Sequence, residues 1–433
     1  MRELPATSYL GSFFDENAVV IVVKEKRLLD SVFSCVSDES FNINVRKINQ
    51  TLKVRGDLVK IPFDLDHWTQ VAAERYPNGL PKPYTDDPTQ WIFHGHPCGS
   101  VIWDEDAKWT AKGPLRTDDS VLQVAVARLL GYRWPAELDP DMELAGEQRA
   151  WVQRCEALLP HADDDGILCI PPVRGEAAAA DRLLNLLAEA YGEAWSTDTL
   201  AALLRSADHA GRPLETWLRD KFFAQHCKRF QQRPFIWHLW DGQRDGFAAL
   251  VNYHQLDRQN LERLIYTYLG DWIRTQERTV AEGRAGADDR LAAAEGLKAK
   301  LEAILEGEAP LDIFVRWKPL EQQPIGWAPD LNDGVRLNIR PFLLAGDVGR
   351  RGAGVLRDKP NIHWKKDRGK DVASAPWFHL GPTYGGKEGD RINDHHLTLA
   401  EKRAAQAAAS NEERVTRPVG SEPVHTDGQE LGG

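Results

Sequence analysis

Residues 228–239 read KRFQQRPFIWHL, and residues 246–254 read GFAALVNYH. The first stretch runs from a Lys/Arg cluster into aromatic and β-branched residues, which favour strands. Asp241-Gly242 is a turn signal, and the second stretch is again apolar. This pattern predicts a β-hairpin whose entry is basic, and it is not the pattern of an active site.

Two further stretches continue the pattern toward the C-terminus. Residues 333–339 read DGVRLNI, and residues 358–371 read DKPNIHWKKDRGKD. Together these stretches closely resemble the C-terminal half of large adenine-specific DNA methyltransferases, the type IIG-like enzymes of restriction–modification and of BREX and DISARM phage defence. The resemblance runs from about Val19 to about Ala404. It implies that the chain is the target-recognition and C-terminal portion of such an enzyme, with double-stranded DNA as its partner.

Two signatures carry catalysis in those methyltransferases. An acidic-x-aromatic-x-Gly-x-Gly turn after a strand holds S-adenosylmethionine, and an Asn/Asp-Pro-Pro-aromatic segment binds the flipped adenine. The nearest match to the second signature is IPPV at residues 170–173, which has no hydrogen-bonding side chain before the prolines and no aromatic ring after them. For the first, residues 346–354 are glycine-rich, but no β-run precedes them and no helical pattern follows. A flexible basic loop is expected there.

We therefore expect no catalytic residue and no cofactor-binding residue in this chain. The resemblance implies that S-adenosylmethionine binds in a missing or partner catalytic domain, and that other defence-system proteins are further partners. The chain would then be either a split-gene subunit or a fragment of a longer enzyme. A Ser/His/Asp or Cys/His triad is not proposed either, because no nucleophile stands in a motif context.

Composition bounds the kind of DNA contact that is possible. The chain has 433 residues and a mass of 48.7 kDa, enough for two or three domains. Its net charge of -11 and pI near 5.7 argue against a basic protein that coats DNA. Charge is uneven, however, because residues 340–371 hold nine Lys/Arg against four Asp, a net of +5. Selective contact with phosphates would use local patches of this kind.

The residues that this reasoning selects for DNA contact form two groups. One group ends a predicted helix and enters the hairpin, and the other lies in the C-terminal segment. A solvated charged face is the alternative for both groups, and cations at a helix end also complement the helix macrodipole. The candidates are Lys228, Arg229, Arg233, Arg350, Arg351, Lys359, Lys365, Lys366, Arg368 and Lys370.

Two histidine-containing segments could be taken for metal sites. Residues 94–98 read HGHPC, but a fourth ligand is missing, so a structural loop is preferred to zinc. Residues 361–364 (NIHW) and 394–396 (DHH) could suggest a histidine–metal nuclease, but the ββα unit such a site needs is not indicated. We expect no metal. The five cysteines form no Cys-x-x-Cys pair, and no signal peptide or run of 18 apolar residues is present, which predicts a cytoplasmic protein.

The periodicity predicts a mixed α/β and α fold. Residues 1–63 combine a β-branched run at 18–23, helical patterns at 26–36 and 41–45 and a strand at 58–63; they resemble the distal part of a target-recognition domain. Such a domain would lack its proximal strands. Beyond it we predict a mainly helical domain ending in the β-hairpin (64–256), a helical hairpin (257–309), an irregular C-terminal module with a last helix at 395–409 (310–409) and a disordered tail (410–433). Helices are expected at 64–75, 117–131, 141–159, 176–192, 197–207 and 213–227.

Two functions from different classes fit these observations. The leading hypothesis is the DNA-recognition and C-terminal part of a site-specific adenine-N6 DNA methyltransferase. The alternative is a non-catalytic structural or interaction subunit, whose helical hairpin docks on other defence proteins without meeting DNA. Salt-dependent binding to duplex DNA separates the two, because phosphate contacts release counterions.

Overall fold

The computed structural model describes most of the chain between residues 19 and 362. The predicted last helix at 395–409 and the predicted disordered tail lie outside the described residues. The described residues are 6, 19–50, 60–306, 311, 338–362, 382, 387 and 388.

The chain divides into two compact units. Unit 1 comprises Met1–Ala162 and Leu183–Arg212, and unit 2 comprises Asp163–Arg182 and Pro213–Gly433. The helix α7, at Ala179–Tyr191, begins in unit 2 and ends in unit 1. The domain boundaries expected from the sequence stay predictions.

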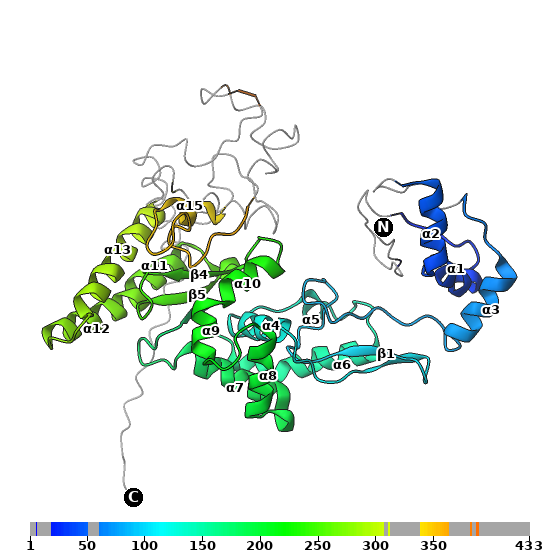
Figure 1. Cartoon of the computed structure of the whole chain (residues 1–433), viewed down its shortest axis with the longest axis horizontal. Coiled ribbons are helices and arrows are strands. Elements are labelled where there is room, and N and C mark those ends of the chain that lie inside the picture. Colours follow the sequence, from blue (N-terminus) through cyan, green and yellow to red (C-terminus); the bar gives the residue numbers. More distant parts are fainter. Residues whose placement is uncertain are drawn as a thin grey trace, which may run out of the picture. The chain divides into compact units, whose positions relative to one another are not determined.

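The N-terminal part of unit 1 is a cluster of three helices, with α1 at Leu29–Val36, α2 at Glu39–Ile48 and α3 at Leu65–Arg75 (Figure 1). A short 3-10 turn, η1 at Lys26–Leu28, leads into α1. An aspartate caps each of α2 and α3, because its carboxylate accepts a hydrogen bond from a backbone N–H of the first turn. The core of this cluster consists of Cys35, Phe41, Val45 and Trp68.

Neither predicted N-terminal strand forms among the described residues. Val19–Val23 and Lys60–Phe63 pair with no strand in the described part of the chain, and Val22 is 83% exposed. β-branched residues form a strand only where a neighbour completes the backbone hydrogen bonds. Pro62 also lacks the N–H that a ladder needs. The strand predictions are therefore wrong for these described residues, whereas the helix predicted at 26–36 is confirmed.

The remainder of unit 1 combines a short hairpin with helices. The strands β1 (Val101–Asp104) and β2 (Trp109–Lys112) pair antiparallel in a segment for which the sequence predicts no strand. The helix predicted at 117–131 begins at Ser120, whose N–H donates to the carboxylate of Asp118 at 2.9 Å. The helices are α4 (Ser120–Leu129), α5 (Pro135–Leu138), α6 (Gly146–Arg154), η3 (Cys155–His161), the end of α7, η4 (Gly192–Ala194) and α8 (Thr197–Ser206).

Unit 2 contains a three-stranded antiparallel sheet with the order β3-β5-β4. The predicted hairpin is confirmed, with β4 at Ile236–Trp240, β5 at Ala248–Asn252 and Trp237 opposite Val251. All residues of both strands are buried. The third strand, β3 at Ile167–Cys169, comes from a distant part of the sequence and is not predicted by it.

The helix α10 packs against β4 of this sheet, and Figure 1 shows it beside the hairpin. The predicted helical hairpin is confirmed: a continuous helical run from Arg258 to Ala281 packs against α13 at Ala287–Glu306. Gly283 and Gly286, both with positive φ, make the turn between them. The remaining bounds are α9 (Leu214–Asp220), α10 (Phe222–Arg229), η5 (Tyr253–Gln255), α11 (Arg258–Glu262), the π-helix η6 (Arg263–Leu269), α12 (Gly270–Ala281) and α15 (Arg340–Leu344).

The fold class is as predicted, mixed α/β and mainly helical with two small sheets. Within the described residues, no helix is both long enough and apolar enough to cross a membrane.

Candidate nucleic-acid interface

The segment 355–357 runs along the outer edge of β4. The N–H of Trp240 donates to the carbonyl of Val355 at 3.2 Å, and the N–H of Arg357 donates to the carbonyl of His238 at 2.8 Å. An open strand edge presents unpaired backbone groups to other chains. The segment covers this edge and thereby fixes the position of the basic residues on either side of it.

Arg357 anchors the segment through its side chain. Its Nε donates to the carbonyl of Arg219 at 2.9 Å, and its Nη2 lies 3.1 Å from Oδ1 of Asp220. The guanidinium also lies over the ring of Trp240, 4.1 Å from the centroid. With three partners inside the protein, Arg357 holds the segment in place and is not a free phosphate ligand.

The turn between α10 and β4 meets the same C-terminal segment. Gln231 and Gln232 adopt left-handed backbone conformations, with φ of 53° and 63°, and the N–H of Gln232 donates to the carbonyl of Cys227 at 2.6 Å. The side-chain oxygen of Gln232 accepts from the N–H of Asn361 at 2.8 Å. These two residues are 129 positions apart, so this contact joins the two groups of predicted DNA-contacting residues.

The six described candidates differ in exposure. Lys228, Arg350, Arg351 and Lys359 are exposed, whereas Arg229 and Arg233 are partly buried. Arg233 has a buried Nε without a hydrogen-bond partner in the described part of the chain. The two partly buried arginines lie against the turn that ends α10, which favours a structural role for them.

Ion pairing also distinguishes the exposed cations. Nη1 of Arg350 lies 3.3 Å from Oδ2 of Asp358, and the Arg350 side chain is 57% exposed. Lys359 forms no ion pair with the carboxylates that the structure describes. The charge of Lys359 is therefore offset less than that of Arg350.

The hairpin beside this surface is held by a buried carboxylate. Asp241 accepts hydrogen bonds from the N–H groups of Gln243 at 2.9 Å and of Phe247 at 2.7 Å. Burial raises the pKa of Asp241 to about 6, although these backbone donors and Arg219 favour the charged form. A Cβ on Gly246 would collide with the same carboxylate, so the turn requires glycine there.

Lys365, Lys366, Arg368 and Lys370 lie outside the described residues, as do His363, His395 and His396 of the nuclease alternative. Their roles stay predictions.

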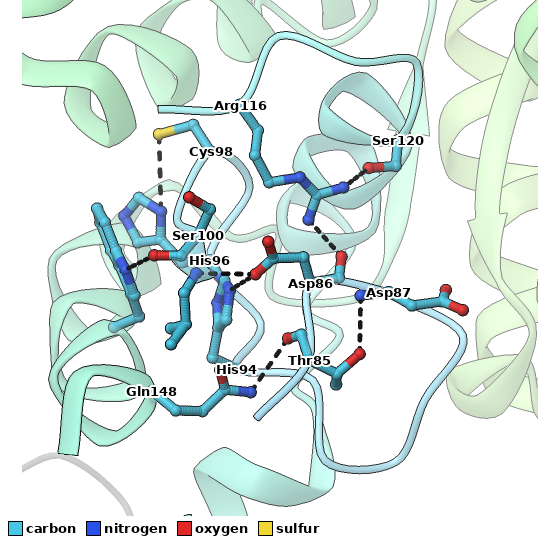
Figure 2. A network of polar contacts seen from close by, with 12 residues as sticks. Thr85, Asp86, Asp87, His94, His96, Cys98, Ser100, Arg116, Ser120 and Gln148 are labelled. Carbon is cyan, nitrogen blue, oxygen red and sulfur yellow. Dashed lines mark hydrogen bonds and ion pairs between the residues drawn. The ribbon is translucent and has the colours of Figure 1, made fainter. Parts of the chain in front are cut away.

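The HGHPC segment of unit 1 forms a buried polar network, which Figure 2 shows. Nε2 of His94 lies 3.8 Å from Oδ1 of Asp86, and Sγ of Cys98 lies 3.7 Å from Nδ1 of His96. Burial lowers the pKa of His96 to about 2 and raises the pKa of Cys98 to about 12. Both groups are thus neutral near pH 7, and no three metal-ligating side chains converge among the described residues.

The two segments nearest to the methyltransferase signatures are packed in unit 2. The N–H of Ile170 donates to the carbonyl of Ala248 at 2.8 Å, and Ile170 and Val173 are buried, so the IPPV segment continues the β3–β5 pairing. The glycine-rich loop follows α15 and not a strand, and Asp347 accepts from the N–H of Gly354 at 3.1 Å. Both segments are thus held by contacts within unit 2.

Comparison with known proteins gives one partial similarity. No protein-family model matches the chain. Over 82 residues the chain is 30% identical to the adenine-specific methyltransferase PglX of Lacticaseibacillus casei (strain Zhang). The matched stretch is 19% of this chain and 7% of that protein, so the chain spans a small fraction of its relative's length. Part of the chain is therefore related to a methyltransferase of this kind.

Proposed function

We propose that this chain supplies duplex-DNA contacts to an adenine-specific DNA methyltransferase that acts in phage defence or restriction–modification. The observation that carries the proposal is the contact between Gln232 and Asn361, which joins two basic groups that are far apart in the sequence. The similarity to PglX supports the methyltransferase setting. The exposure of Lys228, Arg350 and Lys359 supports a role outside the core.

The contacts are those of a positioning surface. Lysine and arginine side chains that neutralise phosphates fix a protein on the duplex, but they carry no sequence information. An acidic chain can bind DNA only where such cations outweigh the nearby carboxylates. Base reading and methyl transfer would come from other parts of the enzyme, and S-adenosylmethionine would bind there, since the IPPV and glycine-rich segments are taken up by packing in unit 2.

The test is duplex binding by the full chain as a function of salt concentration. Each lost phosphate contact should reduce the slope of log K against log salt by roughly 0.9, so a variant with four cations removed should lose about 3 to 4 units of slope. Affinity should fall for all sequences alike. The four substitutions are Lys228→Gln, Arg350→Gln, Arg351→Gln and Lys359→Gln.

A control variant removes the same net charge elsewhere and should keep the slope of the parent protein. If the control and the four-fold variant change binding equally, the effect is one of net charge and not of this surface. If neither changes it, or the parent binds no duplex, the structural-subunit alternative is favoured. The control replaces four exposed arginines with Gln: Arg205, Arg274, Arg278 and Arg284.

A further inference from the structure

A cavity of about 360 Å³ opens in unit 1. Phe33 of α1, Tyr76 at the end of α3 and Trp103 of β1 line it, and Tyr84 adds a fourth aromatic side chain. Pro81 and Pro83, among other residues, complete the apolar part of the wall. This volume lies in the range of pockets that bind small molecules, which are mostly apolar with a few polar groups.

Two edge-on contacts hold three of the rings in place. The Tyr76 ring meets Trp103 edge-on, with centroids 5.6 Å apart, and meets Phe33 edge-on at 6.0 Å. Tyr76 is buried, whereas Phe33, Tyr84 and Trp103 keep part of their surface open. Within the described part of the chain, the hydroxyls of Tyr76 and Tyr84 have no hydrogen-bond partner, so both can donate to a ligand.

The network in Figure 2 fixes one wall of this pocket. Asp86, two residues after Tyr84, accepts from the N–H of Val101 in β1 at 3.0 Å. Gln148 donates to the carbonyl of Thr85 at 3.2 Å. Because β1 also carries Trp103, these bonds fix the position of Tyr84 relative to Trp103. A pocket whose walls are fixed before binding loses less conformational entropy when its ligand arrives.

A second set of contacts fixes the opposite wall. The side-chain amide of Asn78 donates to the carbonyls of Ala107 at 3.2 Å and of Lys108 at 3.4 Å. This ties the end of α3, with Tyr76, to the turn between β1 and β2. All the elements that carry the aromatic rings, apart from α1, are thus joined by hydrogen bonds.

The charges at the pocket favour an anion. Arg75 lies over the Tyr76 ring, 5.5 Å from its centroid. Its charge helps to lower the pKa of Glu105 and of Asp38, but it forms no ion pair within the described residues. Lys82 lines the pocket and is exposed, with Glu143 at 3.9 Å. Glu105, the acidic residue of the lining, is paired with Lys108 at 2.9 Å. A cationic ligand would meet Arg75 and Lys82, so the pocket does not suit one.

We propose that this pocket binds an unpaired nucleobase by stacking against Trp103 and Tyr84, with the adjoining phosphate at Arg75 and Lys82. Aromatic stacking suits every base, since each has a flat π-face, and a nearby cation tracks the backbone. The site lies in unit 1, so it does not depend on the basic surface of unit 2. A proline-rich peptide, which also docks on aromatic grooves, would leave the two cations without a role.

The experiment measures binding of the full chain to a fluorescent dT oligonucleotide by anisotropy and to dAMP by calorimetry. Trp103→Ala should weaken oligonucleotide binding about 5- to 100-fold, the range of losses seen when one stacking ring is removed. Arg75→Gln should lower the salt slope by roughly 0.7, the value for one contact to a single strand. Trp103→Phe should restore binding to within a few-fold, which a misfolded pocket would not allow.

Controls separate this proposal from the duplex surface. Trp91→Ala removes a ring that is 63% exposed and outside the pocket, so it should bind as the parent does. The four-fold Gln variant of unit 2 should keep its affinity for dAMP. If dAMP binds, a free nucleotide is a sufficient ligand for the pocket. If the oligonucleotide binds and dAMP does not, the ligand is a base within a strand. Unchanged oligonucleotide binding by Trp103→Ala, or binding of a proline-rich peptide in its place, would overturn the proposal.

Discussion

The two β-hairpins of this protein are held in place by different means. In unit 2, β4 and β5 are fully buried; β3 covers one side of the pair, and the segment 355–357 covers the other. In unit 1, β1 and β2 have no third strand in the described part of the chain, and Ile102 is 42% exposed. One hairpin is a core element, and the other lies at a surface.

Polar side chains replace the missing strands in unit 1. Asp86 accepts from the N–H of Val101, the indole of Trp151 donates to the carbonyl of Ser100 at 2.9 Å, and Thr110 donates to Glu147 at 2.7 Å. Ile102 lies on the exposed face of this hairpin, and Trp103, on the opposite face, lines the pocket. The hairpin of unit 2 instead provides a rigid edge for a basic loop. The difference suggests that unit 2 is sensitive to lost volume and unit 1 to lost hydrogen bonds.

The largest effect is expected for Trp237→Ala in β4. The ring is 1% exposed and packs on Tyr253 and Phe342, both with centroids at 4.9 Å. Replacing such a buried ring with alanine costs about 3–5 kcal/mol. Hydrogen exchange of the β4 and β5 amides should speed up accordingly, while the β1–β2 amides keep their protection. The control variant Trp91→Ala, at an exposed ring, should leave the exchange of both hairpins unchanged. If Trp237→Ala instead speeds up amide exchange in both hairpins, the two units do not unfold separately.

A smaller effect, confined to unit 1, is expected for Asp86→Ala. The change leaves the N–H of Val101 without its acceptor and removes the carboxylate beside the buried His94. A buried donor left without a partner costs about 1–3 kcal/mol. Exchange should therefore speed up in β1 and β2 and not in β4 and β5. Asp106→Ala, at an exposed carboxylate nearby, is the matched control and should have no such effect.

Local sequence signals account for much of unit 2. The Asp241-Gly242 turn between two apolar runs marks the hairpin, and the Gly-x-x-Gly break marks the two long helices. Both are made by residues close in the sequence, where propensity and turn chemistry act directly. The strand β3 has three residues and pairs with β5 more than 75 positions later, so no local pattern could reveal it. The run Val19–Val23 shows the opposite case, because its strand propensity finds no partner among the described residues.

The candidate sites also combine features that the sequence shows locally with contacts between residues far apart in the sequence. Cations are visible in the sequence, but their exposure is not: among the predicted contacts, Lys228 is exposed, whereas Arg229 and Arg233 are partly buried. That Gln232 and Asn361 bring two basic groups together depends on a tertiary contact that no spacing encodes. The aromatic pocket is less visible still, since Phe33, Tyr76 and Trp103 come from three elements and each alone is typical of a core.

Acid should destabilise unit 2 by a moderate amount. Burial lowers the pKa of His226 to about 3 and also lowers the pKa of His238, from an ordinary value of 6.5. The unfolded chain binds these protons as the pH falls below 6.5, while the folded chain does not, so stability is lost between about pH 6.5 and 3. At pH 5.5 each histidine lowers the free energy of unfolding by about 1 kcal/mol.

The raised pKa of Asp241 acts in the opposite direction. As the pH falls, the folded state binds this proton before the unfolded state does. The stability that Asp241 contributes is therefore present below pH 3.8 and lost as the pH rises through about 6.

The variant His238→Leu should remove one histidine's share of the stability that is lost in acid. The difference in unfolding free energy between pH 7 and pH 5.5 should therefore become smaller by about 1 kcal/mol. Replacing the exposed His67 with Gln, as a control, should leave this difference unchanged. An unchanged difference in the His238 variant would mean that its imidazole is already protonated in the folded protein.

The smallest effects are expected on the exposed surface of unit 2, where they separate two neighbouring cations. Replacing Arg350 or Lys359 with Gln should change stability by less than about 1 kcal/mol, since exposed ion pairs contribute little. In duplex binding, Lys359→Gln should lower the salt slope by roughly 0.9, and Arg350→Gln by less, because Asp358 already offsets part of its charge at 3.3 Å. Asp358→Asn should then strengthen binding, and this gain should disappear in the double variant with Arg350→Gln. Equal slopes for the two single variants would mean that the Arg350–Asp358 pair opens when DNA binds.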